Sequence, residues 1–182
     1  MPLLNTITTP YAEAFLQVSS SKKEVDKVVR QAKDILVIWN ESSEFSEAMA
    51  SPVLEVDSKK AVLEKLFAGK VTASFLNLLK LLADRQRIGY LGAVLERLLE
   101  LYREQRNIAL ATVTSASALN EDQQADLLKK IQSIAGTDNL ELNLNIDPSL
   151  IGGFVVNVGS KVIDASLAGQ VRRLGLALAK VS

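Results

Sequence analysis

The side chains that could do chemistry gather in the last third of this 182-residue chain, around two adjacent glycines. Gly152 and Gly153 resemble the glycine-rich loops that cradle phosphate groups. A phosphate loop, however, leads into a helix and carries a Gly-Lys-Ser/Thr signature, and the sequence after these glycines predicts a strand without that signature. We therefore expect the two glycines to serve turn geometry or a close approach between backbone segments.

Three carboxylates near these glycines could be imagined as an acid/base pair. Strand alternation places Glu141 on a polar face, while Asp147 lies at a turn and Asp164 at a helix start, so solvated or capping roles are favoured. The chain also has no histidine and no cysteine, which removes the commonest acid/base group at neutral pH, the commonest metal ligand and thiolate chemistry. We expect no catalytic residue, cofactor or metal. The alternative is a small-ligand-binding enzyme that uses the Gly152-Gly153 turn.

Composition excludes further classes of function. Twenty-one basic residues balance 21 acidic ones, whereas nucleic-acid-binding proteins usually have a basic excess. Hydrophobic residues make up 48% of the chain, which is ample for a core. No window approaches the roughly 20 uninterrupted apolar residues of a membrane-spanning helix, so we expect no direct membrane insertion.

The second half of the chain has the pattern of a small sheet. Residues 140–146 alternate apolar and polar, which predicts a strand with one buried face. Residues 154–158 and 161–164 predict a hairpin around Gly159-Ser160. A strand over 109–115 and a helix capped by Asn120 and Gln123 precede these segments, and a last helix places Leu167, Val171, Leu174 and Leu178 on one face. We expect a mixed sheet whose two helices cover one face.

The first hundred residues have the pattern of successive amphipathic helices. The first is predicted to begin at Thr9-Pro10, and the second at a capping box formed by Ser21 and Glu24. Further helices are predicted over about 45–49, from Asp57 or Ser58 to Gly69, over 72–83 and over about 90–105. After the polar stretch 103–107, the spacing of the apolar residues no longer has the helical period throughout, and segments with the pattern of strands appear. We therefore predict an α+β chain, with an N-terminal six-helix bundle over 1–106 and a small C-terminal mixed β-sheet domain with two helices over 107–182.

The segment 72–83 differs from the other helices. Its apolar residues cover an arc of roughly 220°, about twice the width of an ordinary buried stripe. A helix at the centre of the bundle would have this pattern, and so would a helix that lines a groove for a partner. The pattern alone does not choose between them.

Several ordered motifs resemble one family. They are Leu-x-Leu-x-Ile-Asp over 142–147, Leu-Ile-Gly-Gly-Phe over 150–154, Val-Asn-Val-Gly over 156–159, Val-Ile-Asp-Ala-Ser over 162–166 and Arg-Leu at 173–174. Pro-Tyr-Ala at 10–12 and Ala-Asp-Arg-Gln-Arg at 83–87 extend the pattern over the chain. Together they resemble the delta subunit of F-type ATP synthases, whose mitochondrial relative is the oligomycin-sensitivity-conferring protein. The chain departs from it at Asn157, where relatives commonly carry a basic residue.

The resemblance implies a non-catalytic stator subunit for ATP synthesis by proton transport, peripheral to an energy-transducing membrane. That membrane would be a bacterial plasma membrane, at its cytoplasmic face, or a thylakoid membrane, at its stromal or cytoplasmic side. In this family, a groove between the first and fifth helices receives the N-terminal helical segment of an alpha subunit of the catalytic head. The C-terminal domain binds the b-type subunits of the peripheral stalk, and the protein is a monomer within the complex. Carried over to this chain, the groove residues are Tyr11, Ala14, Phe15, Val18, Leu78, Leu81 and Leu82. Arg85 and Arg87 border the helix over 72–83, so they are candidates for salt bridges to the partner, whereas the alternative for surface arginines is contact with solvent alone. The structural motif of the second domain is Asp147, Gly152, Gly153, Gly159 and Asp164.

Overall fold

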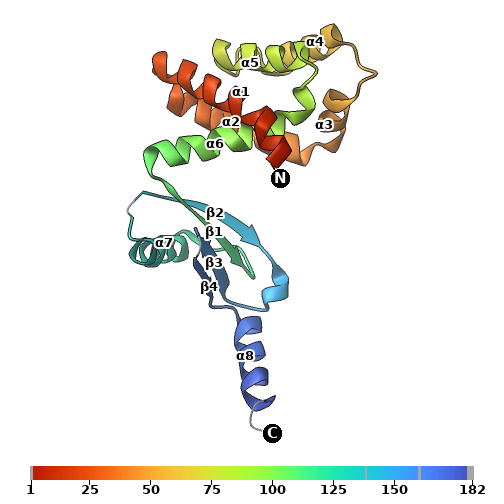
Figure 1. Cartoon of the computed structure of the whole chain (residues 1–182). Coiled ribbons are helices and arrows are strands. Elements are labelled where there is room, and N and C mark those ends of the chain that lie inside the picture. Colours follow the sequence, from red (N-terminus) through yellow and green to blue (C-terminus); the bar gives the residue numbers. More distant parts are fainter. Residues whose placement is uncertain (1, 138, 160, 180–182) are drawn as a thin grey trace. The chain divides into compact units, whose positions relative to one another are not determined.

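The computed structural model of the chain describes residues 2–137, 139–159 and 161–179. The chain divides into two compact units, residues 1–104 and 105–182, and each is described by itself (Figure 1). The first unit is helical and the second contains a mixed sheet, so the predicted α+β class is confirmed. The division lies two residues before the predicted domain boundary.

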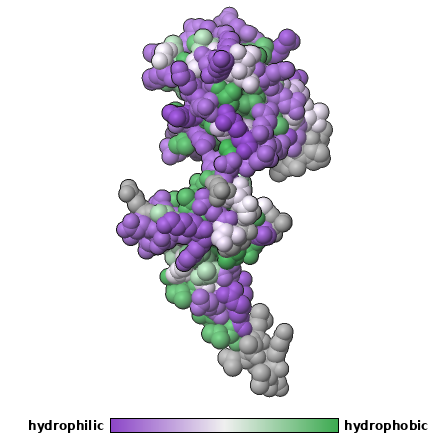
Figure 2. All heavy atoms as spheres, turned by 90° about the vertical axis from the view of Figure 1, so that its left-hand side faces the viewer, coloured by the Kyte–Doolittle hydropathy of each residue, from purple (hydrophilic) through white to green (hydrophobic). Residues whose placement is uncertain are grey.

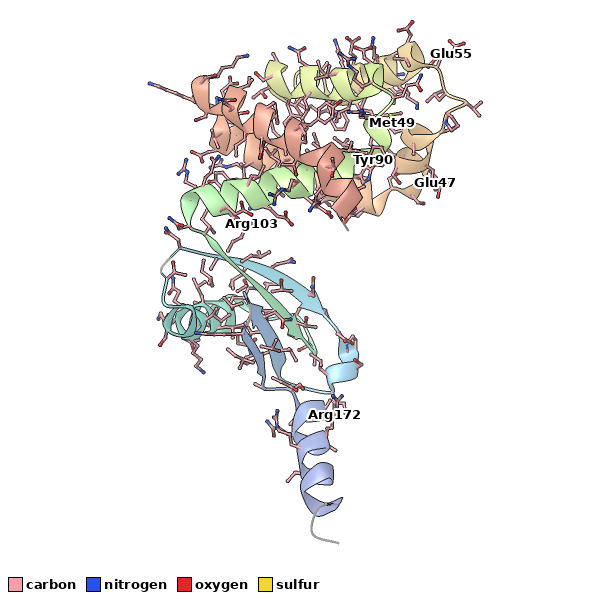
Figure 3. All side chains as sticks on the ribbon, viewed as in Figure 1. Glu47, Met49, Glu55, Tyr90, Arg103 and Arg172 are labelled. Carbon is pink, nitrogen blue, oxygen red and sulfur yellow. The ribbon has the colours of Figure 1, made fainter. Side chains whose placement is uncertain are left out.

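The helical unit contains all six predicted helices. Their bounds are Pro2–Ser21 (α1), Val25–Glu41 (α2), Ser43–Ala50 (α3), Val56–Phe67 (α4), Ala73–Asp84 (α5) and Leu91–Arg106 (α6), and a 3-10 turn over Ile88–Tyr90 (η1) precedes α6. They enclose one apolar core, in which the largest side chains include Ile35, Met49, Phe75, Leu79 and Leu95. Figure 3 shows Met49 on α3 and Tyr90 on η1, two elements that contact each other.

Three predicted helix starts in this unit are wrong. The first helix begins at Pro2, and Pro10 lies inside it, although proline has no backbone donor. Ser21 does not cap the second helix: its hydroxyl donates to the carbonyl of Val18, and α2 begins after Glu24 without a side-chain cap. The serines at the end of α1 lie within the helix, and the Ser19 hydroxyl donates to the carbonyl of Phe15 at 2.7 Å, so this buried hydroxyl has a partner inside the helix. The fourth helix, predicted to start at Asp57 or Ser58, begins at Val56 after Glu55, and no side chain caps it.

The wide apolar arc of α5 is explained mainly by burial. This helix contacts both α1 and α4, and it begins at Thr72, whose hydroxyl accepts the backbone N–H of Phe75. Phe75, Leu79 and Leu82 are fully buried in the core. Only one edge of the arc, at Leu78 and Leu81, is left to line a groove for a partner.

The second unit is a four-stranded sheet with the order β2-β1-β3-β4. The strands are Ala109–Ser115 (β1), Leu140–Ile146 (β2), Phe154–Val158 (β3) and Lys161–Asp164 (β4), and the other elements are α7 (Glu121–Ala135), a 3-10 turn over Pro148–Leu150 (η2) and α8 (Leu167–Ala179). Strand β1 pairs with β2 in parallel and with β3 antiparallel, and β3 pairs antiparallel with β4. The predicted capping box of Asn120 and Gln123 is present at the start of α7.

One face of this sheet packs against α7. Leu127 and Ile131 of α7 form a small core with Ala111, Val113 and Val156. Leu144 and Ile146 point to the same face by register, yet 41% and 60% of their side chains are exposed, so the expectation of a fully buried face on β2 is corrected. Helix α7 covers the part of the face that contains Ala111, Val113 and Val156, and it leaves the end of β2 with Leu144 and Ile146 uncovered.

The expectation that both helices cover the sheet is also corrected. Helix α8 contacts η2 and projects beyond the end of the sheet (Figure 1). Its apolar stripe at Leu167, Val171 and Leu174 is exposed. Figure 2 accordingly shows hydrophobic surface on this unit beside polar surface. The predicted hairpin residue Ser160 and the side chain of Leu178 lie outside the described residues.

Candidate functional site

A groove between α1 and α5 is the candidate site. Phe15 of α1 packs edge-on against Phe75 of α5, with ring centroids 5.2 Å apart and an interplanar angle of 87°. This contact joins the two helices below the surface, because both rings are buried. Above it, a cavity of about 530 Å³ lies open between the helices.

Six of the predicted groove residues line this cavity: Tyr11, Ala14, Phe15, Val18, Leu78 and Leu81. Their side chains divide into a floor and two walls. Phe15 and Leu78 are almost fully buried and form the floor, whereas Val18 and Leu81 are 44% and 43% exposed and form the walls. Because the apolar side chains of both walls are exposed to water, contact with another apolar surface is favourable.

Leu82 does not line the groove, and its assignment to the site is corrected. Its side chain is fully buried and belongs to the core of the helical unit. Leu81 and Leu82 are neighbours in sequence, so they point about 100° apart around α5. Only Leu81 therefore faces the open side of the helix.

The lining also includes Arg87, which the sequence indicated as a candidate for a salt bridge to a partner. It further includes residues that the sequence did not indicate: Thr6, Ile7, Pro10, Lys22, Ser74 and Asn77. Those before Tyr11 were missed because the helix was predicted to begin at Thr9-Pro10. Lys22 was missed because the serines before it were interpreted as a break. A helical repeat carried on from Tyr11 would have reached Lys22, which lies 11 residues, or about three turns, further on.

Polar contacts close the two ends of the groove. At one end, the Lys22 ammonium donates to the Ser74 hydroxyl at 2.8 Å. At the other, the Arg87 guanidinium donates to the Tyr11 hydroxyl at 3.0 Å, and its Cζ lies 5.7 Å from the centre of the Tyr11 ring. Arg85 borders a second hollow at this same end, together with Tyr11, Leu81 and Arg87.

Ion pairs join α5 to α4. Lys60 contacts Asp84, and Lys80 contacts Glu64. The hydrogen bond from Lys80 lowers the pKa of Glu64, and the hydrogen bond to Asp84 raises the pKa of Lys60. These pairs occupy the charged side chains of α5 away from the groove, so its wall at Leu81 stays apolar.

The glycines of the second unit lie at a close approach between two loops. A Cβ on Gly153 would overlap the carbonyl oxygen of Ala165, just before α8, and Gly153 has a φ of +76°. A Cβ on Gly152 would meet the side chain of Leu167 at 2.7 Å. Gly159 also has a positive φ, of +56°. The first two glycines thus let the chain after η2 approach the beginning of α8.

The two aspartates of this unit act as local caps. The Asp147 carboxylate accepts the backbone N–H of Ser149 at 2.9 Å, and the hydrogen bonds from Ser149 lower the pKa of Asp147. The Asp164 carboxylate accepts both the hydroxyl and the backbone N–H of Ser166, which lowers the pKa of Asp164. The Ser166 hydroxyl oxygen in turn accepts the N–H of Gly169 at 3.0 Å. Both carboxylates therefore shape turns.

Over residues 2–137, 139–159 and 161–179, acidic side chains form no group of three that could hold a metal ion. Within the same residues, no helix is both long enough and apolar enough to cross a bilayer.

Comparisons with known proteins agree on one family. Residues 7–178 match the family described as ATP synthase delta (OSCP) subunit. The chain is 80% identical over its 182 residues to an ATP synthase subunit delta of Prochlorococcus marinus, with both chains fully covered. It is 60% identical, again over the full length of both, to an ATP synthase subunit delta of a Synechococcus species. The fold is similar to a chain in the Toxoplasma gondii mitochondrial ATP synthase hexamer, with a TM-score of 0.68 over 93% of this chain and 96% of that one, at 22% identity.

Proposed function

Because this chain belongs to the ATP synthase delta (OSCP) subunit family, we propose that it joins the alpha subunits of the catalytic head to the b-type subunits of the peripheral stalk. Members of this family are stator components of F-type ATP synthases and are not themselves catalytic. The observation that carries the proposal is the open apolar groove between α1 and α5.

The groove is the proposed contact with the head. An N-terminal helical segment of an alpha subunit would lay its apolar face between Val18 and Leu81, above the floor formed by Phe15 and Leu78. Helices that bind in this way place side chains at spacings of three and four residues into a preformed hydrophobic groove. The side chains of both walls are nearly half exposed in the isolated chain, so a bound helix would remove apolar surface from water.

The C-terminal unit is the proposed contact with the stalk. Val171 and Leu174 of α8 are 65% and 64% exposed, and with Leu167 they form one stripe along the helix. A stripe of this kind is unfavourable in water and matches the apolar face of a second helix. We place the b-type subunits against it.

The task of such a connection is mechanical. Rotation of the central stalk exerts torque on the catalytic head, and the head must be held still if proton flow is to drive ATP formation. A subunit in this role needs two firm contacts and no reacting side chain. It is a monomer within the complex, on the side of the membrane that carries the head. The glycine pair Gly152-Gly153 borders a cavity of about 480 Å³. Backbone packing accounts for both glycines, so their presence gives no evidence of its own for the alternative of a small-ligand enzyme.

A binding measurement tests the contact with the head. A fluorescently labelled peptide from the N-terminus of an alpha subunit is titrated with the full chain, and the anisotropy is followed. We expect saturable binding by the full chain and weak binding by Leu81→Asp, since the substitution places a charge on a groove wall. Equal binding by the two proteins would show that the peptide does not use this groove.

A further inference from the structure

The charged side chains that border the groove all have the same sign. Lys22 and Arg87 are the only charged residues among those that line it, and Arg85 borders the adjoining hollow. All three are exposed. The lining residues, all of which the structure describes, include no aspartate or glutamate.

Nearby carboxylates are directed elsewhere. Asp84, which lies three residues after Leu81 on α5, is paired with Lys60 of α4. Glu13 follows Tyr11 by two residues, which turns it about 200° away around α1. The groove is therefore an apolar channel with positive charge at both ends, in a chain whose net charge is zero.

The two positive ends are separated by a defined length of helix. Tyr11, which contacts Arg87, lies on α1, and Lys22 follows it by 11 residues, directly after the last residue of this helix, with its backbone N–H still bonded to the carbonyl of Val18. At 1.5 Å per residue this is about 16 Å, and 11 residues make about three turns, so both positions lie on one side of α1. A second helix lying along α1 has the same rise and would meet the two ends with residues spaced in the same way.

From this geometry we propose that the groove selects an acidic amphipathic helix, with two carboxylates about 11 residues apart on either end of a three-turn apolar stripe. One carboxylate would pair with Lys22 and the other with Arg85 and Arg87. Arginine favours this because its planar guanidinium can donate two parallel hydrogen bonds to a carboxylate. The inference rests on the proposed function, in which the groove receives an alpha-subunit helix, and adds the chemistry that this helix must have.

Three synthetic peptides test the proposal with the full chain. They share one apolar stripe and differ at two positions 11 residues apart, which hold Glu in the first peptide, Gln in the second and Lys in the third. Dissociation constants are measured by anisotropy at 50 mM and 500 mM salt. We expect the Glu peptide to bind at least about tenfold more tightly than the Lys peptide at low salt. The difference should shrink at high salt, because exposed charges are screened there.

Variants locate the effect. Arg85→Glu and Lys22→Glu should each reduce the preference for the Glu peptide several-fold, while Lys65→Glu, on the exposed surface of α4 outside the groove, should leave it unchanged. Circular dichroism verifies that each variant is folded. Equal binding of the three peptides, or a preference that survives Arg85→Glu and Lys22→Glu together, overturns the charge selection and leaves the groove as a docking site. Failure of all three peptides, together with failure of the alpha-subunit peptide, overturns both proposals.

Discussion

At the scale of single residues, Phe15 and Leu81 face the same groove but differ in what they do for the fold. Phe15 is 5% exposed and packs edge-on against Phe75, whereas Leu81 is 43% exposed on a groove wall. Phe15→Ala should lower the free energy of unfolding by about 3–5 kcal/mol, because it opens a cavity in the core. Leu81→Ala should change it by less than about 1 kcal/mol. Urea unfolding followed by circular dichroism measures both.

This difference changes which substitution can test the site. The sequence assigned both residues to the groove, so aspartate at either position would be expected to weaken a bound peptide. The burial of Phe15 predicts that Phe15→Asp unfolds the helical unit, so only Leu81→Asp is informative about binding. If Leu81→Ala were to destabilise the protein as much as Phe15→Ala, Leu81 would belong to the core and the groove would lose a wall.

Gly153 supports a second prediction at this scale. Any side chain there must accept a left-handed backbone and also overlap the carbonyl oxygen of Ala165. Gly153→Ala should therefore destabilise the C-terminal unit by more than the about 1–2 kcal/mol that the left-handed conformation alone costs. Thermal unfolding of the full chain is the measurement.

Gly136 provides the matched control, because it lies in the same unit with a φ of +69° and has open space around its Cβ position. Gly136→Ala isolates the conformational cost from the overlap. Equal losses for the two variants would mean that the loop before β3 does not press against the beginning of α8.

At the scale of elements, the start of α8 depends on the Asp164 carboxylate. Its hydrogen bonds to Ser166 favour the charged form and lower its pKa below the ordinary value of about 4. A group with a lowered pKa contributes stability above its ordinary pKa, and this stability is lost as the pH falls through the folded-state pKa. Asp164→Asn should thus lower the melting temperature at pH 7, and its difference from the original protein should shrink towards pH 3.

The same element carries a glycine that fits this cap. A Cβ on Gly169 would overlap the Asp164 carboxylate, so Gly169→Ala should weaken the cap and lower the melting temperature at pH 7 as well. A melting-temperature difference for Asp164→Asn that stays constant from pH 7 to pH 3 would contradict the role of the charged carboxylate.

Elements fixed by local chemistry were predictable from the sequence. The capping box at Asn120 and the strand over 109–115 each depend on residues within a few positions of each other. The start of α1 was not predictable in this way, because Pro10 is a common helix start and only tertiary packing makes the helix continue through it. The position of α8 was also missed, since its stripe has the pattern of a core helix, and that pattern does not reveal what covers it.

The candidate site was predictable in part. The residues on the face of α1 that repeats from Tyr11 to Val18 were identified because they share a helical stripe. Leu82 was misassigned because the arc on 72–83 combines core and groove residues, and only the packing of α4 and α1 on its two sides separates them. Lys22 and Arg87 lie at the two ends of the groove because of the way in which α1 and α5 pack together. The spacing of residues in the sequence does not reveal this packing.

At the scale of the whole molecule, two exposed apolar features lie on different units: the groove of the helical unit and the α8 stripe of the C-terminal unit. If they bind different partners, a substitution in one feature should weaken binding of one partner and leave binding of the other unchanged. Val171→Asp should abolish binding of a peptide from the C-terminal part of a b-type subunit and leave the alpha-subunit peptide bound. Gln170→Asp introduces the same charge at an exposed position off the stripe, and it should change neither affinity.

The most direct test of the connecting role uses a catalytic head that has been stripped of its own delta subunit. The full chain, Leu81→Asp and Val171→Asp are each mixed with this head and separated by size-exclusion chromatography. We predict that the full chain and Val171→Asp elute with the head, and that folded Leu81→Asp does not. Co-elution of Leu81→Asp to the same extent as the full chain would contradict the claim that this groove holds the head.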